Sequence, residues 1–207
     1  MTNRLESTWR VASIGGRLCL DFANTVDWHA SERPGENLNT FDDLLWWSQQ
    51  VGIMTKRDAR TLGHMAANSP FEAEMVLKQA VVLRETIYRI FSAITAGSMP
   101  NDEDLVTFNE NLSRASLRSR ITKTKDGLSW DWTGGKDTLD WMLDPVIRSA
   151  ADLLVSDDLK RVKRCADTQC GWLFLDVSRN KSRRWCDMKD CGNRAKASRF
   201  YQRKKQA

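Results

Sequence analysis

Residues 165–191 of the chain are CADTQCGWLFLDVSRNKSRRWCDMKDC, a stretch in which two pairs of cysteines flank a spacer. Four residues separate Cys165 from Cys170, four separate Cys186 from Cys191, and the spacer has fifteen. Two such pairs at a hairpin-sized distance are typical of tetrahedral zinc coordination by four thiolates. Because four protein ligands leave no open coordination position, we expect one structural zinc ion and not a catalytic one. Two local disulfides are the alternative, which a reducing compartment disfavours.

The residues around the cysteines predict how the metal site is built. In the spacer, 172–177 is typical of a strand, 178–182 of a turn, and 183–185 of a returning strand that leads to the second pair. Residues 193–205 lack proline and glycine and are expected to form a helix. This order predicts a treble-clef-like zinc-ribbon module, which is small enough to need the metal for its folding energy. One side of the helix is expected to pack on the hairpin: Ala197, Phe200 and Tyr201.

Basic residues are concentrated in the same part of the chain. The net charge is +5, but residues 160–207 contain 15 Lys and Arg against 4 Asp and Glu, whereas the rest contains 17 against 23. This asymmetry favours an anionic partner for the C-terminal segment, with a merely solubilising charge as the alternative. Positions 196, 199 and 203 fall on one helical stripe. The candidate nucleic-acid contacts are Arg179, Lys181, Arg183, Arg184, Arg194, Lys196, Arg199 and Arg203.

Aromatic residues lie among these cations. Trp172, Trp185 and Tyr201 can stack on unpaired bases if their faces are exposed. The alternative is that the aromatic side chains make the small core of the module, and this is the favoured interpretation for Trp172 and Phe174.

The chain before the metal module is predicted to be mostly helical. The strongest helical pattern covers 71–96, where apolar residues recur every three or four positions and Gly97 follows as a stop. Residues 17–26 match both a strand and a helix, and helix is favoured. Further helices are expected over 41–51 with Thr40 as its cap, over 56–67, and from 100–104 onward.

Two turn signals complete the prediction for this domain. Lys125-Asp126-Gly127 lies between alternating residues and indicates a hairpin. Pro145 falls inside the last helical pattern, so either the helix kinks there or Asp144 caps a new helix. The predicted fold class is therefore mainly α, or α+β. It consists of a helical domain with a small hairpin over 1–158 and the zinc module over 159–207.

Two motifs resemble known families. Residues 186–194, CDMKDCGNR, together with the first cysteine pair, resemble the CGNR zinc-finger family, and residues 15–25, GGRLCLDFANT, resemble the opening motif of the ABATE domain. The resemblance implies a bacterial zinc-ribbon-like protein that regulates transcription under stress or binds RNA. It also implies zinc binding by the four cysteines. Asn193 can bond to loop backbone there, and for Arg194 a structural bond and a phosphate contact are equally expected.

Other polar residues carry weaker signals. His29 and His64 lack the spacing of a catalytic or metal motif, so we expect no catalytic residue and no enzyme. Asp21, Asn24 and Trp28 are candidates for a small-molecule pocket, with backbone hydrogen bonding and core packing as the alternatives. The remaining cysteine, at position 19, is expected to be a small core residue.

The composition of the chain indicates its class and its expected location in the cell. With 41% hydrophobic and 29% charged residues, the chain is globular, and it contains no apolar run long enough to cross a membrane. Residues 1–9 lack a secretory pattern, so we expect a cytoplasmic location.

The first hypothesis is a regulator whose zinc module binds DNA or RNA. The second is a protein-interaction module that docks on an acidic partner without nucleic acid. A homodimer and a small-molecule ligand of the helical domain stay open.

Overall fold

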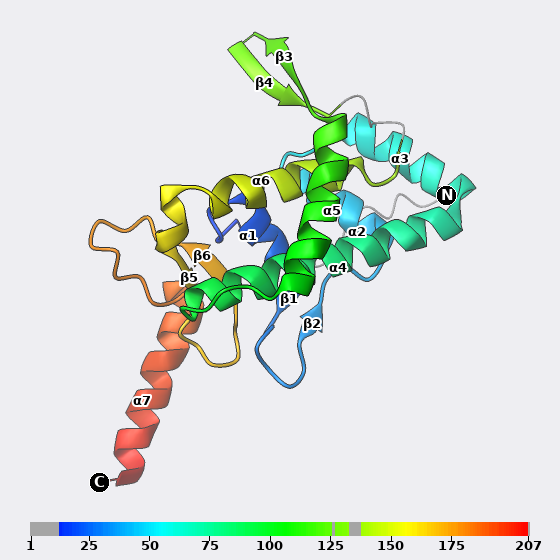
Figure 1. Ribbon diagram of the computed structural model, residues 1–207. Coiled ribbons are helices and arrows are strands. Elements are labelled where there is room, and N and C mark those ends of the chain that lie inside the picture. Colours follow the sequence, from blue (N-terminus) through cyan, green and yellow to red (C-terminus); the bar gives the residue numbers. More distant parts are fainter. Residues whose placement is uncertain (1–12, 126, 133–137, 207) are drawn as a thin grey trace.

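The predicted central helix, α4, spans Pro70–Thr95 and organises the fold (Figure 1). It begins with a proline in its first turn, where the missing N–H has no helical partner, and Gly97, at φ 79°, follows its end. Its apolar stripe is buried, and four other helices, α1, α2, α3 and α5, pack against it. The structure, a computed structural model, describes residues 13–125, 127–132 and 138–206.

The other predicted helices of the body are also present. Residues 17–26 contain a helix, as favoured, because the apolar residues of its inner face are completely buried. Thr40 caps the next helix in a capping box with Asp43, whose N–H its hydroxyl accepts at 3.2 Å. The helices around α4 are α1 (Leu18–Ala23), α2 (Phe41–Gln50), α3 (Lys56–Asn68), α5 (Asp102–Arg118) and α6 (Asp144–Leu154), with 3-10 turns η2 (Trp141–Leu143) and η3 (Asp157–Arg161).

A new helix begins near Pro145, which resolves the two alternatives for that segment. The proline lies in the first turn of α6, directly after η2. Asp144 is not the cap, because it already has helical backbone angles and its side chain makes no capping bond. Instead its carboxylate accepts a hydrogen bond from Arg118 Nη2 at 2.5 Å. The arginine therefore joins the end of α5 to the start of α6.

Among the residues that the structure describes, the strands form three two-stranded antiparallel ribbons. The predicted hairpin is confirmed as β3 (Arg120–Thr124) and β4 (Gly127–Asp131), whereas Asp126 of its turn lies outside the described residues. A second ribbon pairs β1 (Val26–Asp27) with β2 (Gly35–Glu36). The third ribbon lies at the first cysteine pair and pairs β5 (Val162–Arg164) with β6 (Leu173–Leu175).

The predicted hairpin of the metal module is wrong in its pairing. Residues 183–185 are not a strand, and β6 pairs with the residues before the first cysteine pair. The knuckle between Cys165 and Cys170 therefore forms the turn of the ribbon. In this pairing Val162, Leu173 and Leu175 are buried in the core with the helices, whereas Phe174 packs against the cysteine cluster.

The ribbon of the metal module belongs to the same hydrophobic core as the helices. Val162, Leu173 and Leu175 pack in one cluster with side chains of the helical body, and α1 and α4 contact β6. The predicted boundary after residue 158 stays a prediction, but the packing crosses it. Nowhere in 13–125, 127–132 or 138–206 does a helix have the length and apolarity to traverse a bilayer.

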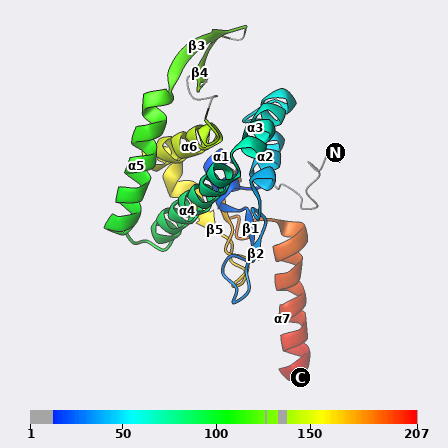
Figure 2. The ribbon, with the colours of Figure 1, turned by 90° about the vertical axis from the view of Figure 1, so that its right-hand side faces the viewer.

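Two segments project from opposite ends of this body. The β3–β4 hairpin leaves one end, and α7 (Asn193–Gln206), after the π-helical turn η4 (Met188–Gly192), leaves the other (Figures 1 and 2). The mainly helical fold class with its C-terminal four-cysteine module is confirmed.

Candidate metal centre and basic surface

The four predicted ligands meet in one buried cluster. The Sγ atoms of Cys165, Cys170, Cys186 and Cys191 all lie within 4.8 Å of one another. Cys186 Sγ is 3.6 Å from that of Cys170 and 3.5 Å from that of Cys191. A Zn–S distance of about 2.3 Å places the sulfurs of a tetrahedral site about 3.8 Å apart. The cluster therefore fits one structural zinc ion.

The four thiols affect one another's pKa because their sulfur atoms lie so close together. Hydrogen bonds with Cys170 and Cys186 lower the pKa of the Cys165 thiol to about 2. The pKa of Cys186 is raised, because its hydrogen bonds to Cys165 and Cys170 require its proton and burial disfavours a second thiolate. Sulfurs this close cannot all ionise without positive charge between them. A bound zinc ion supplies that charge and displaces the protons.

Arg194 gives the cluster a second source of positive charge. Its Nη2 donates to Cys191 Sγ at 3.0 Å, and its Nε donates to Asp167 Oδ2 at 2.9 Å. The guanidinium also lies 4.2 Å from the ring centre of Trp28, which belongs to the helical body. For this arginine a structural bond and a phosphate contact were equally expected, and the structure shows the structural bonds. Asn193 bonds to loop backbone as expected, donating to the carbonyl of Lys189 at 2.9 Å.

Asn24 attaches the first cysteine pair to the body. Its side-chain oxygen accepts from the N–H of Leu173 at 2.9 Å, and its Nδ2 donates to the carbonyl of the same residue at 2.8 Å. Trp172 Nε1 donates to the carbonyl of Val26 at 2.8 Å, so this ring is a structural contact. The knuckle is thus bonded along its edge to the α1–β1 segment.

Gly171 is required at this junction. Its φ is 73°, and a Cβ there would lie 2.8 Å from both Ala30 N and Tyr88 Oη. The backbone of the knuckle therefore approaches the body closely enough for Ala30 N to donate to Gln169 O at 3.2 Å.

The side chains considered for a small-molecule pocket bond to backbone or lie at this junction. Asp21 accepts from the N–H of Gly15 at 2.8 Å, and burial raises the pKa of its carboxyl to about 6. Asn24 bonds to the metal knuckle. Trp28 has a φ of 55°, unusual for a bulky residue, and lies under Arg194. For the first two residues, these contacts match the backbone-bonding alternative.

Asp176 holds in place the basic loop, which we define as residues 177–185, between β6 and Cys186. Its buried carboxylate accepts from Lys163 Nζ at 2.6 Å, from the Ser178 hydroxyl at 2.5 Å and from the N–H of Arg183 at 3.0 Å. Burial alone would raise the pKa of Asp176, but the ammonium and these donors hold it well below its usual range. The prediction placed this residue in a strand and missed its role. Its spacing to Ser178, typical of an Asx turn, was the available signal.

The structure separates the predicted basic residues into two groups. Arg183 and Arg194 are bonded internally; the guanidinium of Arg183 lies 4.3 Å from the ring centre of Phe174, and its Nε donates to Trp185 O at 3.0 Å. The side chain of Arg199 lies outside the described part of the structure. The others are exposed and make no ion pair with any described residue: Arg179, Lys181, Arg184, Lys196 and Arg203.

The predicted packing of α7 on the hairpin is wrong. Phe200 is 62% exposed and Tyr201 is 65% exposed, and their rings contact each other edge to face. Ala197 is exposed as well. The reason is that α7 leaves the metal centre pointing away from the body, so the ribbon is out of its reach (Figures 1 and 2).

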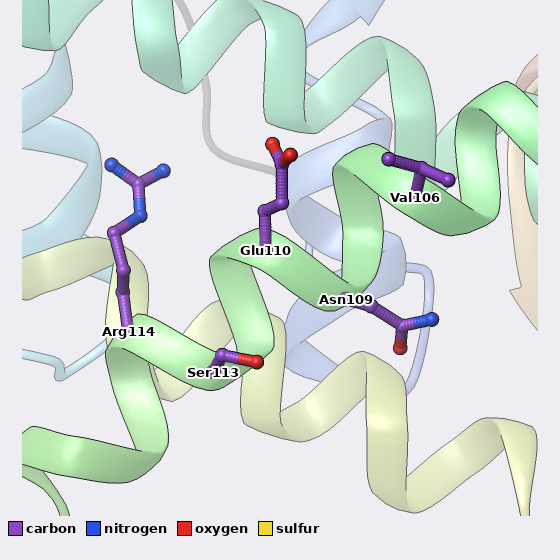
Figure 3. Close-up of a pocket in the computed structure, with 5 residues that line it drawn as sticks. All are labelled: Val106, Asn109, Glu110, Ser113 and Arg114. Atoms are coloured by element: carbon purple, nitrogen blue, oxygen red, sulfur yellow. The ribbon is translucent and has the colours of Figure 1, made fainter.

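The helical body also carries polar groups, and several of them are paired with one another. Figure 3 shows a groove along α5 in which Glu110 and Arg114 point to one side of the helix and Asn109 and Ser113 to another. On another part of the body, His29 Nε2 lies 2.9 Å from the carboxylate oxygen Oε2 of Glu85. Cys19 is completely buried, which raises the pKa of its thiol to about 12 and makes it the expected core residue.

Comparison with known proteins identifies two families along the chain. Residues 16–157 match the model of the ABATE family, described as "Putative stress-induced transcription regulator", and residues 161–204 match the CGNR zinc finger. A search of curated proteins finds no significant match. The ABATE match alone covers more than half of the chain. The predicted resemblance is confirmed: the chain belongs to the ABATE family and carries a CGNR zinc finger at its C-terminal side.

Proposed function

We propose that this chain is a transcription regulator that binds DNA or RNA through the exposed basic residues around its zinc centre. The observation that carries the proposal is the division of the arginines and lysines. Two of them support the metal site, whereas five present their charges to solvent from a loop and a helix that the site holds in place. Fixed, exposed cations without carboxylate partners suit phosphate groups.

The arrangement supports binding and not catalysis. Four cysteine ligands leave zinc no position for a water molecule or a substrate, so the metal acts on the fold. The metal centre fixes the start of α7, and Asp176 fixes the loop that carries Arg179 and Lys181. A zinc site of four thiolates suits a reducing location such as the cytoplasm, which stays part of the proposal. A homodimer and a small-molecule ligand of the body stay predictions.

Salt dependence tests the proposal. The zinc-loaded full chain is titrated into fluorescein-labelled single- and double-stranded oligonucleotides between 50 and 200 mM salt, with anisotropy as the readout. Nucleic-acid binding is expected to fall steeply with salt, and an Arg179→Ala/Lys181→Ala/Arg184→Ala variant should lower the log–log slope by about 1 per lost phosphate contact.

A matched variant controls for net charge. Lys56→Ala/Arg60→Ala/Lys123→Ala removes three exposed cations of the body and should leave the slope unchanged. If the chain binds no oligonucleotide at low salt, or if both triple variants behave alike, the proposed surface is wrong. Absence of nucleic-acid binding is the result that docking on an acidic protein predicts.

A further inference from the structure

A groove of about 520 Å³ lies beside the zinc centre, between the basic loop and η4. Its wall is mainly apolar and includes Trp185 and Met188, and the hydroxyl-bearing Ser178 and Ser182 lie on its loop side. Cys186 also contributes to the wall, so the groove borders the metal site.

The groove combines an aromatic ring with positive charge. The guanidinium of Arg184 lies 5.3 Å from the ring centre of Trp185, and Arg184 itself is exposed. Arg179 and Lys181 extend from the same loop, whereas the carboxylate of Asp187 lies on the opposite wall and caps the N–H of Lys189 at 2.6 Å. Phosphates are therefore favoured on the loop side, and the apolar space between is left for an uncharged, flat group.

We infer that this groove binds an unpaired base of a single-stranded polynucleotide, with Trp185 as the stacking surface and Arg179, Lys181 and Arg184 on the flanking phosphates. The inference rests on the proposed function and narrows its ligand. Bases in a duplex are stacked on their neighbours and expose only their edges in the grooves. A splayed base exposes its face, and aromatic and arginine side chains bind that face in single strands.

The test compares single-stranded RNA, single-stranded DNA and duplex DNA of one sequence, by anisotropy with the zinc-loaded full chain at a fixed salt concentration. Single strands should bind more tightly than duplex. Trp185→Leu keeps an apolar side chain against the metal cluster but removes the ring, so single-strand affinity should fall about 5- to 150-fold. Trp185→Phe keeps a ring and should retain most of the affinity. Zinc content is measured for each variant.

Trp130 offers a matched control. This tryptophan is partly exposed and lies on the β3–β4 hairpin at the other end of the molecule. The guanidinium carbon of Arg148 lies 4.1 Å from the centre of its ring. Trp130→Leu should leave single-strand affinity unchanged. The inference is overturned if duplex binds as tightly as single strands, or if Trp185→Leu and Trp185→Phe have the same affinity. Failure to bind any of the three oligonucleotides instead overturns the proposed function.

Discussion

The two halves of the zinc centre are built differently, although they hold the same metal. The first cysteine pair lies in a ribbon whose strands are part of the body's hydrophobic core and whose edge is bonded to Asn24 and Val26. The second pair lies at the end of a loop and just before α7, on which Phe200 and Tyr201 are exposed. One half is anchored by packing and the other by the metal.

This difference explains where the exposed charge lies. The half that is packed on the body uses its polar groups internally, in bonds from Lys163 and Arg161 to Asp176. The half that depends on the metal uses Arg183 and Arg194 internally but leaves Arg179, Lys181, Arg184, Lys196 and Arg203 in solvent. In this account zinc connects the packed ribbon to the exposed basic surface for which a nucleic-acid partner is proposed.

Loss of one ligand from the second pair should have the largest effect. In Cys191→Ser, three thiolates bind zinc far more weakly, and α7, a 14-residue helix that contacts the body near its start through Arg194, is marginal on its own. We expect loss of the one zinc per chain and of the α7 contribution to the circular dichroism signal, while the body still unfolds cooperatively. Retention of full helicity without zinc would contradict this account.

Removing the anchor of the first half should cost less but affect the whole fold. Asn24→Ala leaves the buried N–H and C=O of Leu173 without partners, at a cost of about 2–4 kcal/mol. Urea unfolding of the zinc-loaded protein measures the change. Asn109→Ala, at an exposed position on α5, is the control and should change the free energy of unfolding by less than about 0.5 kcal/mol. Equal costs for the two variants would show that the anchor is unimportant.

Arg194 joins the two halves and should affect the metal more than the body. Arg194→Ala removes the hydrogen bond to Cys191 Sγ and the contact with Trp28. Loss of such an outer bond typically costs about 10- to 100-fold in metal affinity. Competition with a zinc chelator measures this, and Arg184→Ala, which removes an exposed arginine, is the control. An unchanged zinc affinity in Arg194→Ala would contradict the assigned role.

Asp21 should make stability depend on pH. Because its folded pKa is about 6, above the ordinary value of 3.8, folding favours the protonated carboxyl, and stability falls as pH rises between about 4 and 6. Asp21→Asn removes this loss, so its stability relative to the parent should rise by about 1–3 kcal/mol from pH 4 to pH 7. Zinc release in acid affects both proteins alike and cancels in the difference. Parallel pH profiles would be the contrary result.

The smallest effect is expected on the exposed face of α7. Phe200 is solvent-exposed and contacts only Tyr201 among the described aromatic rings. Phe200→Ser should therefore behave as an ordinary surface substitution and change the free energy of unfolding by no more than about 0.5 kcal/mol. Thermal unfolding of the zinc-loaded protein measures the change. A loss above about 1 kcal/mol would show that the helix packs on another part of the chain.

The comparison also marks how far the sequence could predict the structure. Local signals were sufficient where the determinant is local: the spacing of the four cysteines, the capping box at Thr40, the Asp-Gly turn and the periodicity of α4. They were insufficient for the partner of β6, because both flanking segments had strand-like residues. The choice was made by burial against α1 and α4.

Two site residues depended on contacts that the sequence could not place. Asn24 lies 149 positions from Leu173, and nothing in its local pattern identifies that partner. Amphipathic spacing suggested that Phe200 and Tyr201 would pack, but packing also requires a surface within reach, and α7 points away from it.

Hydrogen exchange with and without zinc tests the central claim most directly. After chelation of zinc from the full chain, we expect the amides of 186–206 to lose their protection and those of 162–164 and 173–175 to keep most of theirs, because the ribbon stays in the core of the body. Simultaneous loss of protection in both segments, or retention in both, would contradict the division of the zinc centre into a packed half and a metal-dependent half.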